Sequence, residues 1–508
     1  MYKLTYLFAL IATTSLHAQT IETSEDWRSQ AKEFTAKLDT KKDINKKAKN
    51  LILFIGDGMS SATITATRIY DGQKKGMFGE ENILSFERFA ELGLSKTYNS
   101  NQQTPDSAGT ATAIMTGVKT RAGMLSVGAS NLRAKCTKKQ EDLETIMEWA
   151  EKNGYATGVV TTTRITHATP ASTYAHTPER DWEVDSKTPQ DAIKNGCKDI
   201  ARQLVEFDHG DGLDVVLGGG YSYFIPKEKG GKRKDKRDLV EQWQKKHSDG
   251  VFVTNRSELL AQAPKAKRMF GLFTPSHMSF DEARDPKKEP SIKEMTDAAI
   301  KILSRNKKGY VLMIEGGRID HGNHLGIAKL AIGDTRAMAK AVGFARENTK
   351  KEETLIIVTS DHGHVLSLSG YPVRGNPILG KVVGNDKYGE KQKDYTRDLS
   401  GLPYTTLNYA NGGGYMLGGK IERSGFTGYK YKKKALARPD LTNVDTEALY
   451  YHQEAVIPLG METHSGEDVA IYADGPRAYY FNSVMEQNLI FHAMKAALDK
   501  PEKSWWGF

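Results

Sequence analysis

The chain has 508 residues, of which 38% are hydrophobic, and this is enough for a large folded core. Its net charge of +9 favours attraction of anionic substrates, or else reflects lysines scattered over the surface. After the N-terminus no stretch is apolar for the ~20 residues of a membrane span, so a membrane protein is not expected. The densest basic run, 227–237, has no aromatic residues and is interpreted as a solvated loop, so a dedicated nucleic-acid-binding protein is not expected either.

The N-terminal 18 residues have the pattern of a secretory signal peptide. Lys3 precedes an apolar run over 4–13, and Ala18 offers a small residue for cleavage. The alternative is a buried N-terminal strand or helix. We therefore expect a signal peptide over 1–18, a mature domain over 19–508 and a periplasmic or secreted protein. The C-terminal residues 500–508 lack the hydrophobic tail of a glycolipid anchor signal, so no membrane anchor is expected.

Short β-branched or aliphatic runs predict buried strands, and helical patterns lie between them, including 143–152 and 293–304. Strands that alternate with helices favour an α/β fold. We expect a three-layer sandwich in which a large, mostly parallel sheet is covered by helices on both faces. The predicted strands are 51–55, 157–161, 214–217, 310–314, 355–359 and 469–472.

The segment 366–458 breaks this alternation. It is rich in glycine, tyrosine and lysine, yet it also contains aliphatic residues that could form a small core. A disordered linker is the alternative, but the tyrosines and aliphatic residues argue against it. The sequence therefore predicts an inserted subdomain at the mouth of the sheet.

The segment 105–113 places a serine at the start of a predicted helix. Asp106 and Ser107 stand just before a run of small, helix-compatible residues. The unpaired N–H groups and the dipole of a helix start favour negative charge, so the position suits an oxyanion or a phosphate bound to the hydroxyl. The alternative, for this segment alone, is an ordinary N-cap serine.

Carboxylates and histidines follow three of the predicted strands, and one more histidine precedes the last strand. In open α/β sheets, sites form outside the carboxyl ends of the strands, so these side chains are expected at one edge. Nitrogen and oxygen donors without thiolates suit Zn²⁺, whereas carboxylate, hydroxyl and water suit Mg²⁺. The residues concerned are Asp57, Glu315, Asp320, His324, Asp361, His362 and His464.

A single acid or histidine of this kind would be explained by a salt bridge or a packed core position. Four groups at successive strand ends favour a metal site instead. No histidine stands near Ser107 in the sequence as a general base, and a metal could replace one by stabilising the serine alkoxide. A two-metal site would then suit in-line phosphoryl transfer.

Taken together, these motifs resemble the alkaline phosphatases, and closely the vertebrate tissue forms. The resemblance runs from about residue 50 to residue 472. Each segment is moderately specific, and their common order is very specific. The segments that carry the resemblance are 54–59, 105–110, 161–164, 173–177, 315–322, 361–362 and 462–468.

The resemblance implies the roles of the residues that meet the phosphate. Ser107 is expected to be the nucleophile that becomes phosphoserine. Arg180 is expected to hold two phosphate oxygens, a task for which its planar fork is suited, and Asp106 to orient that arginine.

The resemblance also implies two zinc ions and one magnesium ion per chain. The expected ligands are Asp320, His324 and His464 for the zinc that activates water, Asp57, Asp361 and His362 for the zinc that activates the nucleophile, and Asp57, Thr169 and Glu315 for magnesium. His167 is expected behind the magnesium, bonded through water. His321 and His364 are expected to orient carboxylates or waters.

Some positions depart from the family or lie outside its motifs. Thr169 replaces a serine, which is chemically mild, and Thr274 stands where the vertebrate enzymes have a calcium-binding glutamate, so no calcium site is expected. Four further histidines are interpreted as surface or core residues without a role in the site. These histidines are His209, His247, His277 and His492.

The chain has only two cysteines, Cys136 and Cys197. In an exported protein such a pair suggests a disulfide, although two buried free thiols are also compatible with the sequence. The resemblance places a disulfide at these positions. It also implies that 366–458 corresponds to the crown insertion of the vertebrate enzymes and that the protein is a homodimer.

The sequence therefore predicts an exported phosphoric monoester hydrolase that acts on small phosphate monoesters with two zinc ions and one magnesium ion. One alternative is a phosphodiesterase or sulfatase of the same superfamily, which would differ at the nucleophile. A second alternative is a non-catalytic surface protein that binds metal or phosphate. The first alternative is disfavoured by Ser107, Arg180 and the magnesium ligands, and the second by the complete set of ligands.

Overall fold

The structure is a computed structural model that describes residues 23–40, 47–416, 421–422, 430–431 and 438–499. The expected signal peptide and the residues 500–508 lie outside these ranges, as does part of the expected insertion. No described helix is both long and apolar enough to cross a lipid bilayer.

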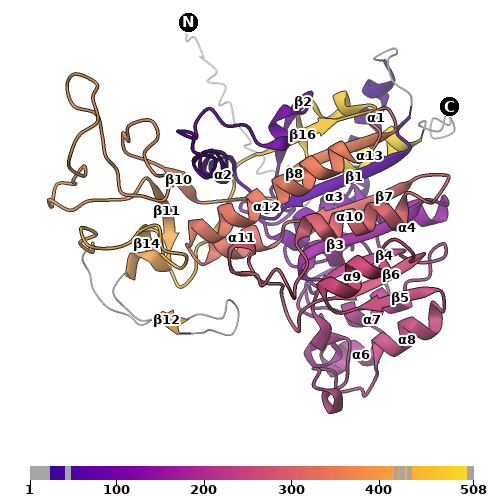
Figure 1. Cartoon of the computed structure of the whole chain (residues 1–508). Coiled ribbons are helices and arrows are strands. Elements are labelled where there is room, and N and C mark those ends of the chain that lie inside the picture. The colour runs from indigo at the N-terminus through magenta and orange to yellow at the C-terminus, as the bar shows by residue number, and fades with distance from the viewer. Residues whose placement is uncertain (1–22, 41–46, 417–420, 423–429, 432–437, 500–508) are drawn as a thin grey trace, which may run out of the picture.

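A ten-stranded sheet forms the centre of the molecule, in the order β17-β2-β16-β8-β1-β7-β3-β4-β6-β5 (Figure 1). Its strands are parallel except β16, which runs antiparallel to both of its neighbours. The bounds are β1 Asn50–Gly56, β2 Glu91–Lys96, β3 Ala156–Arg164, β4 Val215–Gly219, β5 Gly250–Val253, β6 Arg268–Leu272, β7 Tyr310–Glu315, β8 Thr354–Ser360, β16 Val469–Asp474 and β17 Val484–Glu486. The six strands predicted from the sequence are confirmed.

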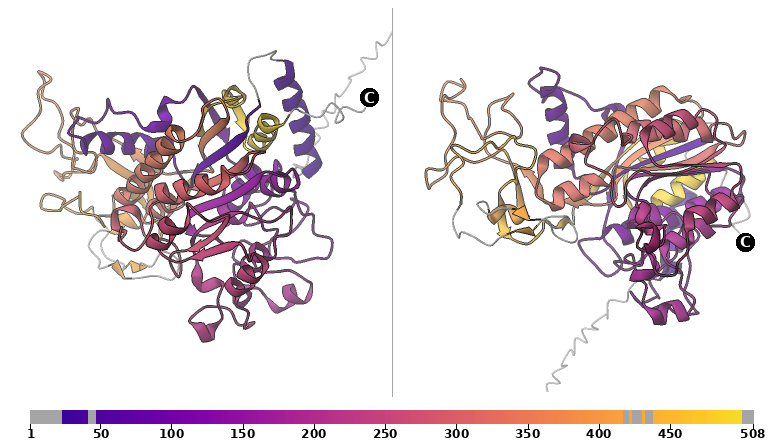
Figure 2. Two further views of the ribbon diagram at one scale, coloured as in Figure 1. Left: turned by 45° about the vertical axis from the view of Figure 1, so that its right-hand side comes forward. Right: turned by 60° about the horizontal axis from the view of Figure 1, so that its bottom comes forward.

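Helices cover both faces of this sheet (Figures 1 and 2), which confirms the three-layer α/β fold. Alternate residues of β1 explain why both faces need covering, because Leu53 and Ile55 belong to one apolar core and Ile52 and Phe54 to the other. Helices that contribute to the first core are α1 Ser24–Thr40, α3 Ser107–Thr116, α4 Ile146–Lys152, α5 Ala168–Ala171, α7 Ile200–Glu206, α8 Leu239–Lys246 and α13 Leu489–Leu498. Helices that contribute to the second core are α2 Ser61–Gln73, α9 Arg256–Gln262, α10 Ile292–Leu303, α11 Arg318–His324 and α12 Ala328–Glu347. A further helix, α6, spans Gln190–Lys194.

The helix predicted over 143–152 begins later than expected. Thr145 caps α4 by accepting a hydrogen bond from the Glu148 N–H, and Glu148 returns a carboxylate oxygen to the Thr145 N–H. This capping box fixes the first helical residue at Ile146. The helix predicted over 293–304 is α10, which starts at Ile292 because Ser291 and Glu294 form the same motif.

Within the segment 366–458, the described residues form a separate small sheet rather than a linker. Its strands are β10 Leu366–Leu368, β11 Leu407–Gly412 and β14 Ala455–Pro458. A two-stranded ladder, β12 Ile421–Glu422 with β13 Lys430–Tyr431, lies in the same segment. In Figures 1 and 2 these elements project to one side of the central sheet.

The basic run 227–237 is not simply a solvated loop, and that prediction is wrong for Arg233. The Arg233 guanidinium is fully buried and makes paired hydrogen bonds with both carboxylate oxygens of Asp199 and of Asp235. Such bidentate pairs satisfy a buried guanidinium. Arg233 therefore anchors the run to the domain, while Lys229 pairs with acids at the surface.

Cys136 and Cys197 form a disulfide that closes a loop of sequence separation 61. The double variant C136A/C197A is expected to lose roughly 4 kcal/mol of unfolding free energy, because the open chain gains entropy when unfolded. Urea denaturation of the two proteins measures the difference. A loss below about 1 kcal/mol would show that this loop is not constrained in the way the chain-entropy argument requires.

Candidate active site

Three neighbouring strands bring acids to one edge of the sheet. β1 lies between β7 and β8, with Ile55 paired to Glu315 on one side and to Thr359 on the other. All three strands run in the same direction, so the residues at their carboxyl ends meet. Asp57 and Asp361, which follow β1 and β8, and Glu315, which ends β7, are fully buried there.

One cluster consists of Asp57, Asp361 and His362. Their donor atoms lie within 4.8 Å of one another, and His362 Nε2 is 3.3 Å from an oxygen of each carboxylate. Burial is the largest influence on Asp361, and together with the neighbouring Asp57 it raises the pKa of that carboxyl to about 7. The two acids and the histidine are therefore held in a geometry that suits a divalent cation.

A second cluster is centred on Asp320. Its Oδ1 is 3.2 Å from His324 Nε2 and 3.3 Å from His464 Nε2, and the two Nε2 atoms are 3.0 Å apart. The Nδ1 of His324 donates to the Glu462 carbonyl and that of His464 to the Pro105 carbonyl. When neutral, each ring therefore has its lone pair on Nε2, and two lone pairs aimed at one point suit a zinc ion between them.

The ladder of β9 Gly363–His364 and β15 His464–Ser465 holds this second cluster together. It pairs His364 with His464. His364 Nε2 lies 2.9 Å from Asp320 Oδ1, and its Nδ1 faces the buried Glu462 carboxylate at 2.5 Å. His364 thus bridges two carboxylates, as expected from the sequence. The role of Glu462 as its second partner was not predicted, because only the fold brings the two side chains together.

The expected magnesium ligands also converge. Asp57 Oδ2 is 3.4 Å from Thr169 Oγ1, and the donor atoms of Asp57, His167 and Glu315 lie within 4.8 Å of one another. Glu315 Oε2 accepts hydrogen bonds from threonine hydroxyls, whereas its Oε1 is buried without a hydrogen-bond partner among the described residues. An unpaired buried carboxylate oxygen is costly and fits a hard cation.

Ser107 is the first helical residue of α3, and Asp106 is the N-cap. The Asp106 side chain accepts the Gly109 N–H at 3.2 Å, so the interpretation of Ser107 as an N-cap is wrong. Ser107 is buried, with its Oγ 3.1 Å from His362 Nε2 and 3.5 Å from Asp57 Oδ1. The hydroxyl therefore lies beside the first cluster and at the positive end of a helix.

Arg180 lies next to this serine. Its Nη1 donates to Asp106 Oδ2 at 3.0 Å, and its Nη2 is 3.3 Å from His167 Nε2. Burial opposes ionisation of Asp106, but Arg180 and two backbone N–H groups outweigh it and lower the pKa of the carboxyl. The ion pair fixes one side of the guanidinium and leaves further N–H donors for an anion.

Two of the histidines interpreted as surface or core residues make contacts with other side chains. His277 packs against His321, with ring centroids 4.3 Å apart, and against His167. His209 Nε2 lies 3.1 Å from Glu148 Oε1. His321 was expected to orient a carboxylate or a water, but the polar partner of its ring is an arginine, with its Nδ1 2.9 Å from an Arg318 nitrogen. The sequence shows nothing that would distinguish His277, because its partners come from other segments.

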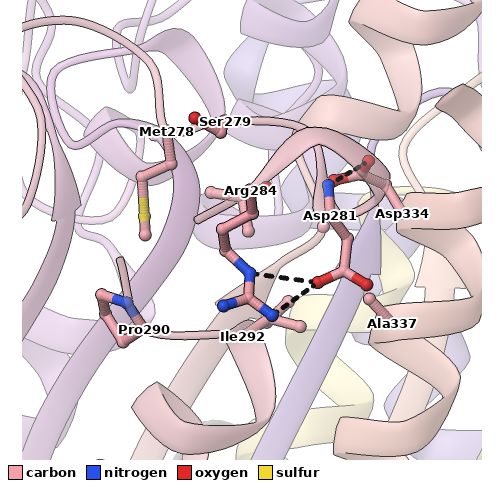
Figure 3. A pocket seen from close by; sticks show the side chains of 10 residues that line it. Met278, Ser279, Asp281, Arg284, Pro290, Ile292, Asp334 and Ala337 are labelled. Atoms are coloured by element: carbon pink, nitrogen blue, oxygen red, sulfur yellow. Dashed lines mark hydrogen bonds and ion pairs between the residues drawn. The ribbon is translucent and has the colours of Figure 1, made fainter. Parts of the chain in front are cut away.

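A small pocket lies near the end of β7, lined by Met278, Arg284 and Asp334 among others (Figure 3). Arg284 pairs with Asp281, whose N–H donates to the buried Asp334 carboxylate. Burial, and then the nearby Asp281 charge, raise the pKa of Asp334 to about 8. The carboxyl is therefore protonated in the folded protein at neutral pH.

The stability of the folded protein should depend on pH through Asp334. Because its folded pKa is raised, the contribution of this carboxyl is complete below about pH 4 and is lost as the pH rises towards 8. Asp334→Asn removes this dependence, so the variant should gain up to about 1.4 kcal/mol per pH unit relative to the wild type across that window. Thermal unfolding at pH 5, 7 and 9 measures it, and parallel curves for the two proteins would contradict it.

The fold and this site define a class of protein. A buried serine at a helix start, an adjacent arginine and two histidine–carboxylate clusters at the carboxyl edge of a mostly parallel sheet are the parts of a metal-dependent hydrolase.

Comparison with known proteins identifies the family. A family model described as alkaline phosphatase matches residues 48–500. The chain is 41% identical over 509 residues to the tissue-nonspecific alkaline phosphatase of Gallus gallus, covering 97% of this chain and 92% of the relative. It is 40% identical to the tissue-nonspecific isozyme of Homo sapiens, covering 96% and 90%. The chain belongs to the alkaline phosphatase family, a family of phosphoric monoester hydrolases.

Solved structures have the same fold. A TAB5 alkaline phosphatase variant with magnesium bound is 25% identical, with a TM-score of 0.60 and coverage of 90% of this chain and 99% of that one. The alkaline phosphatase of Thermus thermophilus is 24% identical, with a TM-score of 0.61 and coverage of 91% and 93%. The central sheet and its helices are therefore those of the family.

Proposed function

We propose that the protein hydrolyses phosphate monoesters through a phosphoserine formed on Ser107, with two zinc ions and one magnesium ion per chain. The observation that carries the proposal is the position of the Ser107 hydroxyl, 3.1 Å from His362 Nε2 and next to Asp57, at the start of α3. A nucleophile, cation ligands and a helix N-terminus thus meet at one point.

The side chains divide the work between them. Arg180 binds the phosphate oxygens with the N–H groups that Asp106 leaves free, and Ser107 attacks the phosphorus. Metal ions held by the two clusters and by Asp57, Thr169 and Glu315 would supply positive charge that stabilises the serine alkoxide and the departing oxygen. Hydrolysis of the phosphoserine by water then regenerates Ser107. Two displacements leave the configuration at phosphorus unchanged.

The assignment of ligands to each metal rests on the donor sets. Asp320, His324 and His464 offer one oxygen and two imidazole nitrogens, and Asp57, Asp361 and His362 offer two oxygens and one nitrogen, which suits zinc. The unpaired Glu315 oxygen suits magnesium. His167 is proposed to contact the magnesium through water, since a ring nitrogen lies within 4.8 Å of the donor atoms of Asp57 and Glu315 and its Nε2 faces Arg180. The magnesium bound in the TAB5 variant adds support for a metal-dependent enzyme.

Export and assembly complete the proposal. The pattern of residues 1–18 favours a signal peptide and a periplasmic or secreted enzyme, and a disulfide between Cys136 and Cys197 agrees with an oxidising compartment. The small sheet of β10, β11 and β14 belongs to the segment 366–458, which we propose as the crown-like insertion of a homodimer.

Two measurements test the proposed activity. The purified protein should hydrolyse p-nitrophenyl phosphate faster than bis-p-nitrophenyl phosphate, and it should carry two zinc ions and one magnesium ion per chain by atomic emission. Faster turnover of the diester would favour a phosphodiesterase. Activity in a protein free of zinc would overturn the metal assignment.

A further inference from the structure

Asp106 has every acceptor position of its carboxylate occupied. Oδ2 accepts Arg180 Nη1 and the Gly123 N–H, both at 3.0 Å. Oδ1 accepts the Gly109 N–H at 3.2 Å and the side-chain amide of Asn99 at 2.9 Å. Two of these donors belong to the backbone and one is Arg180 itself, so Asn99 is the side chain that supports the carboxylate from the other side.

The amide of Asn99 is oriented by Asp106 and by nothing else among the described residues. Asn99 is buried, its Nδ2 donates to Asp106, and its Oδ1 has no hydrogen-bond partner in the described part of the chain. A buried amide oxygen without a partner is unfavourable, because its hydrogen bonds to water are lost and not replaced. Rotating the amide by 180° would place that oxygen against the Asp106 carboxylate. The amide therefore keeps its hydrogen bond to Asp106, and its oxygen is left without a hydrogen-bond partner among the described residues.

Gly109 makes room for this contact. It lies inside α3, where glycine is less favourable than alanine. A Cβ added to Gly109 would lie 2.4 Å from Asn99 Oδ1 and 2.8 Å from Asn99 Nδ2. These distances are too short for any methyl group, and the amide is the end of a short, buried side chain. The glycine of this helix is therefore explained by the approach of Asn99.

The backbone around Asn99 is tied to the same loop that holds Arg180. Asn99 and Gln102 exchange backbone hydrogen bonds, and the Ser100 N–H donates to the Thr120 carbonyl. The next residues of that loop reach the site, because the Gly123 carbonyl accepts the Arg180 N–H. The turn that carries Asn99 and the loop that anchors Arg180 thus form one unit around Asp106.

We propose that Asn99 is a positioning residue for phosphate binding, which acts by holding Asp106 in the orientation that aims Arg180 at the phosphate. This inference rests on the proposed function of Arg180 and deepens it. Without the amide, the Oδ1 side of Asp106 retains only one backbone donor, so the carboxylate and the guanidinium paired with it are free to turn. Affinity for phosphate then falls, while Ser107 and the metal ligands are left in place.

The test compares Asn99→Leu with the wild type in the metal-loaded, full-length enzyme. The leucine keeps the approximate shape and removes the donor. The inhibition constant of inorganic phosphate and the KM for p-nitrophenyl phosphate should both rise about tenfold, since loss of a hydrogen bond to a charged group typically lowers affinity by this factor or more. The kcat should change by less than about threefold, because the lost interaction is made with bound substrate and transition state alike. Zinc content should be unchanged.

Gly109→Ala tests the same contact from the helix. The added methyl displaces the Asn99 amide, so the variant should raise the phosphate inhibition constant as Asn99→Leu does, although alanine favours the helix. In an Asn99→Ala background there is room for the methyl, and Gly109→Ala should have no further effect. In an Asp106→Ala background, Asn99→Leu should likewise add nothing.

Asn82→Leu is the matched control. Asn82 is also buried and donates to a carboxylate, Asp71, at 3.0 Å, but it lies on another part of the fold. It should lower thermal stability and leave phosphate inhibition unchanged. A purely structural role of Asn99 would give this same result for Asn99→Leu and for Gly109→Ala, and would overturn the inference. A wild-type enzyme that neither hydrolyses p-nitrophenyl phosphate nor binds phosphate would instead overturn the proposed function, and this inference with it.

Discussion

Ser107→Ala is expected to lower the turnover of p-nitrophenyl phosphate by at least about 10³-fold, because removing a nucleophile costs this much or more in other hydrolases. The change removes one oxygen, which lies 3.1 Å from His362 Nε2. Asp106 remains as the helix cap, so α3 keeps its start. The loss should therefore be chemical rather than structural, and steady-state assays measure it.

Two controls separate loss of the nucleophile from loss of the fold. The variant should keep the thermal midpoint and the zinc content of the wild type. Acid quenching after incubation with radiolabelled phosphate should trap label on the wild type and none on Ser107→Ala. A variant that keeps more than about a tenth of the activity would refute the role of Ser107.

Removal of the metal ions is expected to lower activity as much as Ser107→Ala does, and also to lower the stability of the fold. Four carboxylates are buried at one edge of the sheet, and their mutual repulsion grows when no cation lies between them. They are Asp57, Glu315, Asp320 and Asp361. Three ions bound at about 1,000 times their dissociation constants would together contribute roughly 12 kcal/mol, or roughly 10 °C in the thermal midpoint of a chain of this size.

Treatment with EDTA followed by calorimetry and assay measures both effects. Activity and midpoint should return when zinc and magnesium are added together, and not with calcium. Asp361→Asn should lose one zinc ion per chain, whereas Asp334→Asn, which alters a buried carboxyl outside the clusters, should retain both. Full activity after complete chelation would contradict the proposed metal dependence.

The fold could be predicted where the strands are continuous apolar runs. β1, β7 and β8 are buried along nearly their whole length, and each contains a central run of apolar residues. β2 could not be predicted, because its leucines face solvent rather than the core. Leu92 and Leu94 are exposed, whereas Gly93 and Ser95 face the interior. A Cβ on Gly93 would lie 2.0 Å from the Phe481 carbonyl, so tertiary packing and not hydrophobicity sets this strand.

The site likewise contains residues that the sequence could predict and residues that it could not. Asp57 and Asp361 could be predicted because each follows a strand, and the sheet alone makes strand ends meet. Asn99 and Glu462 could not, because their importance depends on partners that are distant in the chain, such as Asp106 for Asn99. A side chain that supports another side chain leaves no periodicity or spacing in the sequence. Its position becomes evident only when hydrogen bonds can be followed through space.

The ladder between β9 and β15 has a consequence for how this fold can change. It pairs His364 with His464, so the chain leaves the second cluster and returns to it at the same place. Lengthening the chain between these two strands should therefore cost little, because doubling a loop costs only about 0.6 kcal/mol. Part of this chain has to stay in place, since the Tyr409 hydroxyl donates to Asn323 on α11, the helix that carries Asp320 and His324. Changes of length are therefore expected to be tolerated best at exposed positions of 366–458 that do not contact the helices of the central domain.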